Sequence, residues 1–251
     1  MENLITKELE GAKQFYITTK EKDGAEIAEL TSRNVHIAEA MIMQDSRYFK
    51  SADVNNAEST AYWMNELKGI LCDNMEVTDK YYETVITKAV EAVDKDNTTH
   101  LNADKVGRKQ ISDRLCNISR EKLKEYLANP KGADYKLIEI ISKETTGTNK
   151  PRRNISFASK FCHYAAFYLF DGQEQQDNFS IYDEVLRKAM IKRYIPFYEI
   201  DADMSLITGE KKAEGYKAYQ AAVDAVIKKA GNKISRNGFD HLVWYYYKGR
   251  I

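Results

Sequence analysis

The stretch that decides the fold reads KPRRNISFASKFCHYAAFYLF over residues 150–170 and, after a polar break, FSIYDEVLRKAM over residues 179–190. Its apolar residues recur at helical spacing, so it predicts two helices joined by a loop. Each helix carries one ionisable residue where a solvated face would not place it, Lys160 in the first and Asp183 at the start of the second. A lysine and a carboxylate set in this way are the components of a nucleophilic site.

The composition is that of a mainly helical globular protein. The chain has 251 residues, of which 43% are hydrophobic and 30% charged, and it contains only 3 Pro and 12 Gly to interrupt helices. This length allows one large or two modest domains. We expect a mainly α fold with two helical sub-regions and a cleft between them, formed by residues 58–251. Residues 1–57 are expected to form an N-terminal extension, with a short strand over QFYITT (14–19).

Hydroxyl side chains ahead of apolar periodic runs mark where several helices begin. Such caps predict helices after Ser59, Thr78, Ser119 and Ser235. Helical spacing alone predicts further helices over residues 25–44, 103–118, 135–142 and 214–230.

Two segments break this helical pattern. Residues 194–208, which include Pro196, are expected to be irregular. The run TTGTNKPRR (145–153) is the expected hinge between the two sub-regions.

Charge and cysteine content exclude several classes of protein. Lys+Arg and Asp+Glu both total 38, so the net charge is zero, and a nucleic-acid role would need a local basic patch. The three separated cysteines suggest neither a disulfide framework nor a zinc site, as expected for a cytoplasmic protein. His36 and His100 have no partner at metal-ligand spacing, so no metal is expected. The chain shows no signal peptide and no apolar run that predicts a membrane span.

Lys160 lies on a predicted helix that is apolar almost all round, with Phe157, Tyr164 and Phe167 clustered about it. Partial desolvation among aromatic rings lowers the pKa of a lysine, which a nucleophilic amine requires. The alternative is that Lys160 extends from a packed helix to water. His163, one turn further on, is expected to be a hydrogen-bonded packing residue.

Asp183 stands at the predicted start of the next helix. A carboxylate there can cap the helix and meet the positive end of its dipole, which alone explains many such residues. The functional alternative is that it faces a cleft and stabilises a developing cation or orients a nucleophile. Arg187 and Lys188, one turn on, would supply positive charge nearby.

The pair resembles the helix-hairpin-helix DNA glycosylase superfamily. That family has a hairpin of the form G-x-G-x-K and a later segment V-D-T-H-V-x-R. SFASK (156–160) occupies the hairpin position here, without its glycines, and IYDEVLR (181–187) occupies the aspartate position. The segments look closest to a divergent bacterial branch that retains S-F-A-S-K-[FY]-C and I-Y-D.

The resemblance implies a helical DNA glycosylase that acts on a base flipped out of the stack, and it implies no cofactor. It implies Lys160 as the Schiff-base nucleophile of a glycosylase with lyase activity, and Asp183 as the catalytic carboxylate. Side chains that could meet phosphates are Lys150, Arg152, Arg153, Arg187 and Lys188. Side chains that could stack on the base are Tyr164, Phe167 and Tyr182, although aromatic residues at helical spacing are more often core.

Two alternatives to this enzyme stay open. One is a catalytically inactive DNA- or protein-binding module of the same helical fold, which the missing glycines and the zero net charge favour. The other is a helical protein unrelated to nucleic acid. The sequence does not specify the target base or the oligomeric state.

Overall fold

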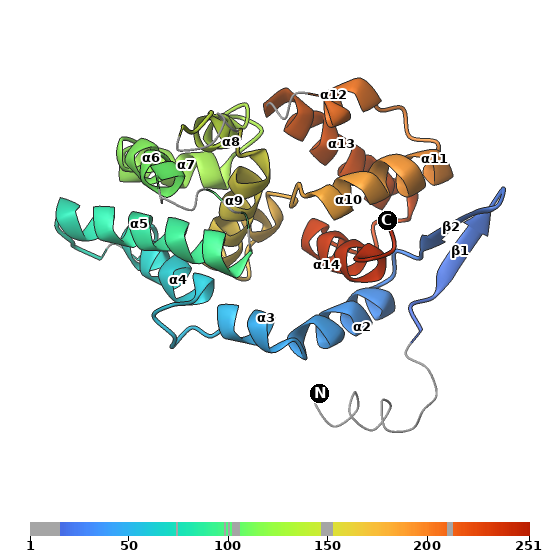
Figure 1. Ribbon diagram of the computed structural model, residues 1–251, viewed down its shortest axis with the longest axis horizontal. Coiled ribbons are helices and arrows are strands. Elements are labelled where there is room, and N and C mark those ends of the chain that lie inside the picture. Colours follow the sequence, from blue (N-terminus) through green and yellow to red (C-terminus); the bar gives the residue numbers. More distant parts are fainter. Residues whose placement is uncertain are drawn as a thin grey trace. The chain divides into compact units, whose positions relative to one another are not determined.

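The protein is described by a computed structural model over residues 16–73, 75–97, 99, 101, 106–146, 153–209 and 213–251. Within these residues the chain is mainly helical, with one two-stranded sheet near the N-terminal end (Figure 1). The expectation of a mainly α fold is therefore confirmed. None of the described helices is long and apolar enough to cross a membrane.

The chain divides into two compact units that are not consecutive in sequence. The first comprises residues up to 46, 184–202 and 222–251, and the second comprises residues 47–183 and 203–221. This division differs from the expected separation of residues 1–57 from the rest. Of the expected hinge at 145–153, residues 147–152 lie outside the described residues, and both flanks belong to the second unit. The boundaries between the two units lie after residues 46, 183, 202 and 221.

The first unit combines a hairpin with helices from both ends of the chain. Its elements are β1 (Thr19–Lys22), β2 (Ala25–Ala28), α2 (Ser32–Met43), α10 (Glu184–Ala189), the π-helical segment η2 (Met190–Tyr194), α11 (Ile195–Tyr198), α14 (Arg236–Tyr247) and the second half of α13 (Ala213–Lys229). In this unit α14 packs against α2 and α10.

The hairpin replaces the beginning of a predicted helix. β1 and β2 are antiparallel, and Lys22 pairs with Ala25 across the turn residues Asp23 and Gly24, whose φ angles are 51° and 76°. Positive φ at both positions is the type I′ geometry that an Asp-Gly pair favours. The helix predicted from residue 25 begins only at Ser32, and the strand predicted over 14–19 is displaced to begin at residue 19.

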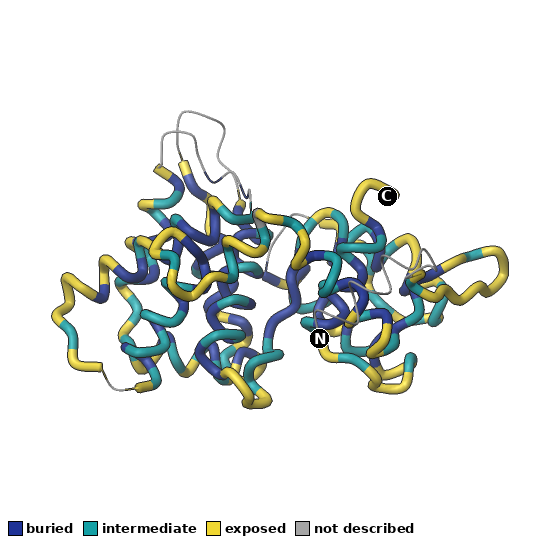
Figure 2. Tube along the Cα trace, turned by 90° about the horizontal axis from the view of Figure 1, so that it is seen from below, coloured by how far each residue is buried: buried dark blue, intermediate teal, exposed yellow. Residues whose placement is uncertain are grey.

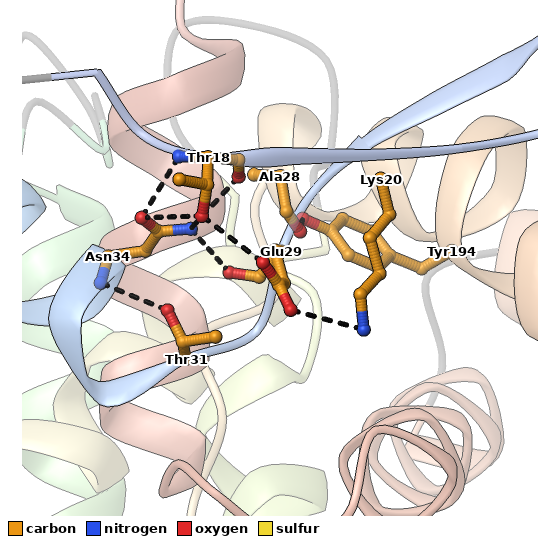
Figure 3. A network of polar contacts seen from close by, with 7 residues as sticks. All are labelled: Thr18, Lys20, Ala28, Glu29, Thr31, Asn34 and Tyr194. Carbon is orange, nitrogen blue, oxygen red and sulfur yellow. Dashed lines mark hydrogen bonds and ion pairs between the residues drawn. The ribbon is translucent and has the colours of Figure 1, made fainter.

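A buried amide joins the hairpin to the first helix (Figure 3). Asn34 is fully buried, and its Nδ2 donates to the carbonyl oxygens of Thr18 at 2.9 Å and Glu29 at 2.8 Å. Its Oδ1 accepts from the Thr18 N–H at 3.0 Å. At the end of β2, the Tyr194 hydroxyl donates to the Ala28 carbonyl at 3.1 Å. The hairpin is thus anchored through its backbone at both strands.

The second unit is a bundle of helices. Its elements are α3 (Ser46–Ser51, which begins at the unit boundary), α4 (Thr60–Leu71), α5 (Asp79–Asp96), α6 (Val106–Cys116), α7 (Arg120–Ala128), α8 (Lys136–Ser142), α9 (Ile155–Leu169), the 3-10 turn η1 (Glu174–Asp177), α12 (Met204–Thr208) and the first half of α13. Residues 194–208 were expected to be irregular, which is wrong, because α11 and α12 lie within them.

Local capping chemistry places several of these helices where the sequence predicts them. The hydroxyls of Ser59, Thr78 and Ser119 each accept a hydrogen bond from a backbone N–H three residues on. Ser235 does the same for α14 in the first unit. These four predicted starts are confirmed, because each depends on neighbours in sequence alone.

Helix α9 is the central helix of the second unit. It packs against α4, α5 and α8, and its side chains Phe157, Phe161 and Ala165 are almost completely buried. Along the chain trace, buried stretches alternate with exposed ones, and many of the exposed stretches are loops (Figure 2). Burial on several sides agrees with its apolar sequence. Any polar group on this helix therefore stands among packed neighbours.

The buried Asp94 carboxylate links the end of α5 to residues that follow it and to α6. The Asp94 side chain is 2% exposed and accepts from Arg108 Nε at 2.6 Å and from the Leu101 N–H at 3.1 Å. It also accepts from the Thr99 hydroxyl. Asp94 thus binds two residues that follow α5, Thr99 and Leu101, and one residue of α6, Arg108.

Candidate active site

Lys160 lies in the middle of α9, on the half-buried side of an otherwise enclosed helix. One turn before it, Phe157 is 1% exposed and its ring lies 6.1 Å from that of Phe161. Burial lowers the pKa of the Lys160 amine from its ordinary value, and the Asp183 carboxylate opposes this shift without cancelling it. A neutral amine is therefore more accessible at physiological pH than on an exposed lysine.

Asp183 immediately precedes α10, at the helix N-terminus, as its sequence context predicts. Its side chain is half-buried, and it is the charged group that acts electrostatically on Lys160. Lys160 and Asp183 both belong to the second unit, so their proximity is a property of one compact body. Two residues that lie 23 positions apart in sequence are thus within electrostatic range of each other.

The residues that lead to Asp183 form a buried non-helical segment, residues 178–183, which we call the strap. Two side chains on α9 bind its backbone. The Ser159 hydroxyl accepts from the Tyr182 N–H at 2.9 Å, and His163 Nδ1 lies 2.8 Å from the Phe179 carbonyl oxygen. His163 is thus the buried, hydrogen-bonded residue that its position on an apolar helix predicts.

Helices α13 and α7 hold the beginning of the strap. The Tyr216 hydroxyl donates to the Ser180 carbonyl at 3.0 Å, and Gln220 Nε2 donates to the Asn178 carbonyl at 2.8 Å. Asn178 Nδ2 donates in turn to the carbonyl of Leu127, in the last turn of α7, at 2.8 Å. Asp183 therefore follows a backbone that is fixed at almost every residue.

The three aromatic residues proposed for a base pocket have different surroundings. Tyr164 is half-buried and its hydroxyl donates to Asn97 Oδ1 at 3.0 Å. Phe167 is half-buried and stacks on His163 with ring centres 6.3 Å apart.

Tyr182 is 4% exposed, its hydroxyl donates to the Ile207 carbonyl at 2.6 Å, and its ring meets the edge of Tyr219. Tyr164 and Phe167 share α9 with Lys160, whereas Tyr182 is packed into the interior.

The structure describes three of the five proposed phosphate contacts. Lys150 and Arg152 lie outside the described residues. Arg153 is exposed just before α9, in the second unit. Arg187 and Lys188 are half-buried on α10, in the first unit, and Lys188 pairs with Glu184 at 2.7 Å.

Sequence reasoning missed Ser159, which is fully buried beside Lys160. Its hydroxyl donates to the Ser156 carbonyl at 3.0 Å while it accepts from Tyr182. A serine inside an apolar helix must satisfy its hydroxyl nearby, and this was the available signal.

Two further findings bear on identity. Within the described residues, no group of three or more His, Cys, Asp or Glu side chains could hold a metal ion. Comparison of the chain with protein-family models, with curated proteins and with solved structures gave no match.

Proposed function

We propose that this protein is a base-excising enzyme similar to DNA glycosylases, in which Lys160 is the amine nucleophile and Asp183 the catalytic carboxylate. The observation that carries the proposal is a partly buried amine, with its pKa lowered by burial, within electrostatic reach of a carboxylate. Shifted pKa values of this kind concentrate at functional sites.

The chemistry follows from the two groups. The neutral Lys160 amine attacks C1′ of a deoxyribose as the bond to the base breaks, and the base leaves with that electron pair and takes up a proton. The attacking nitrogen gives up a proton, the sugar ring opens, and an imine joins Nζ to C1′. Asp183 stabilises the positive charge on the sugar and on the iminium. Water then hydrolyses the imine, or elimination of the 3′ phosphate cleaves the strand.

Support for DNA as the substrate comes from the resemblance of residues 156–160 and 181–187 to the two catalytic segments of the family. This chain must bind DNA phosphates through other groups than the glycine hairpin of the family. Because α9 begins at Ile155 and continues through Ser156, Phe157 and Ala158 without a glycine, this stretch offers no glycine hairpin for close approach of a phosphate. Arg153, exposed at the start of α9, is the described side chain best placed to compensate.

Borohydride trapping on DNA with an abasic site tests the proposal. Reduction of the imine should give a covalent protein–DNA adduct that is absent in Lys160→Ala. Lys88→Ala is the matched control, because Lys88 is an exposed lysine of the same unit that pairs with its helix neighbour Glu91. The control should form the adduct as the natural protein does.

The other results have definite meanings. Absence of an adduct from the natural protein would refute the lyase chemistry. Base release without an adduct would instead point to Asp183 activating a water. DNA binding without either reaction would favour the alternative, a catalytically inactive binding module.

A further inference from the structure

We propose that Ser159 is a positioning residue that holds the Asp183 carboxylate beside the Lys160 amine. This inference rests on the proposed function, since it assigns a role within the same site. It concerns the residues immediately before the two catalytic groups. Ser159 precedes Lys160, Tyr182 precedes Asp183, and one hydrogen bond of 2.9 Å joins the Ser159 hydroxyl to the Tyr182 N–H.

This hydrogen bond fixes the distance between the residue before Lys160 and the residue before Asp183. Ser159 is fully buried in the middle of α9, so its position is fixed by the helix and its packing. Its hydroxyl proton is committed to the Ser156 carbonyl at 3.0 Å, which leaves an oxygen lone pair directed to Tyr182. The orientation of the accepting lone pair on Ser159 is therefore set within α9 and does not depend on the strap.

The bond to Ser159 holds the peptide N–H one residue before the reactive carboxylate. Upstream, His163, Tyr216 and Gln220 hold residues 178–180 of the strap. The Tyr182 side chain is held separately, through its hydroxyl, by Ile207. Loss of the Ser159 hydroxyl would leave the strap anchored and Tyr182 packed, but it would remove this hydrogen bond and let the backbone next to Asp183 shift.

A shift of the Asp183 carboxylate would change the pKa of the Lys160 amine, because the two groups interact electrostatically. Burial lowers the pKa of the Lys160 amine and the Asp183 carboxylate raises it. If the carboxylate retreats toward water, its attraction weakens and the pKa of Lys160 falls further. The amine would become easier to deprotonate, yet it would lose the group that stabilises the cationic intermediate.

The test measures the Lys160 pKa directly, by NMR titration of the lysine side-chain Nζ and Cε signals, with the signal assigned by its loss in Lys160→Met. Asp183→Asn should lower this pKa, and Ser159→Ala should lower it in the same direction by a smaller amount. Ser112→Ala is the matched control, because Ser112 is another buried helical serine of the same unit, bonded to the Arg108 carbonyl at 3.0 Å. It should leave the Lys160 pKa unchanged.

Ser159→Cys provides a second measurement, because sulfur is close in size but a weaker acceptor. It should fall between the natural protein and Ser159→Ala. A Lys160 pKa that responds to Asp183→Asn and not to either Ser159 variant would overturn the positioning role. A Lys160 pKa that ignores Asp183→Asn would overturn it as well.

The titration also separates this inference from the proposed enzyme activity. If the natural protein gives no borohydride adduct but Ser159→Ala shifts the Lys160 pKa, positioning stands and the chemistry fails. If the adduct forms and Ser159→Ala has no effect on the Lys160 pKa, the chemistry stands and positioning fails.

Discussion

Replacement of Asp94 by alanine should destabilise the second unit strongly. The Asp94 carboxylate is 2% exposed and accepts hydrogen bonds from Arg108 Nε, the Leu101 N–H and the Thr99 hydroxyl. Removal of one partner from a buried ion pair typically costs about 3–5 kcal/mol, because the remaining charge stays desolvated. The Arg108 side chain is 27% exposed, so water can hydrate it in part. We therefore expect a loss near the lower end, about 3 kcal/mol.

The measurement is urea denaturation followed by circular dichroism, with the free energy of unfolding extrapolated to water. Asp94→Asn should lose less, because its amide oxygen can still accept from Leu101 and Thr99, although its NH2 group cannot accept from Arg108. Asp113→Ala is the control, since Asp113 pairs with Lys109 at 2.6 Å in the same unit with both side chains exposed. Such surface pairs contribute roughly 0–1 kcal/mol. A loss for Asp94→Ala no larger than that of the control would refute the reasoning.

Two further predictions concern the candidate site. Lys160→Met should unfold at higher urea than the natural protein at neutral pH, because the folded chain disfavours the protonated amine and so destabilises itself below the lowered pKa. This advantage should shrink as pH rises through the ordinary lysine pKa of 10.5, because the amine is neutral in both states above that value; an advantage that does not depend on pH would contradict it. Tyr182→Phe should cost about 1–2 kcal/mol in the same assay, because the Ile207 carbonyl loses its 2.6 Å partner. Its borohydride adduct should be unaffected, and loss of the adduct would argue for a role of the hydroxyl in the reaction.

The predictable part of the fold is the part that local chemistry decides. Helix starts at Ser59, Thr78, Ser119 and Ser235 could be predicted because an N-cap needs only its own neighbours. The hairpin was missed although its Asp-Gly turn is a short-range signal. Apolar spacing in residues 25–44 fits a helix, and it conceals a strand that is buried at only one end, at Ile27 and Ala28.

The candidate site divides in the same way. Lys160 and Asp183 could be singled out because charge is unusual in their apolar surroundings. Their proximity could be suggested only by resemblance, since it depends on how the strap crosses α9. Nothing in the sequence indicates which backbone groups Ser159 and Gln220 bind, because those groups lie 23 and 42 residues away. Tertiary contacts of this kind are visible only in the folded chain.

Each unit is built from separate stretches of the chain, and the order of these stretches has a consequence for folding during synthesis. The hairpin and α2 are synthesised long before α14, against which α2 packs. The first unit therefore cannot finish folding until α14 has been made. The second unit lacks residues 203–221 until late, including Tyr216 and Gln220, which hold the strap. The nascent chain thus carries Lys160 and Asp183 before residues 203–221 are available to hold the strap, so the site should mature only after that segment has been synthesised.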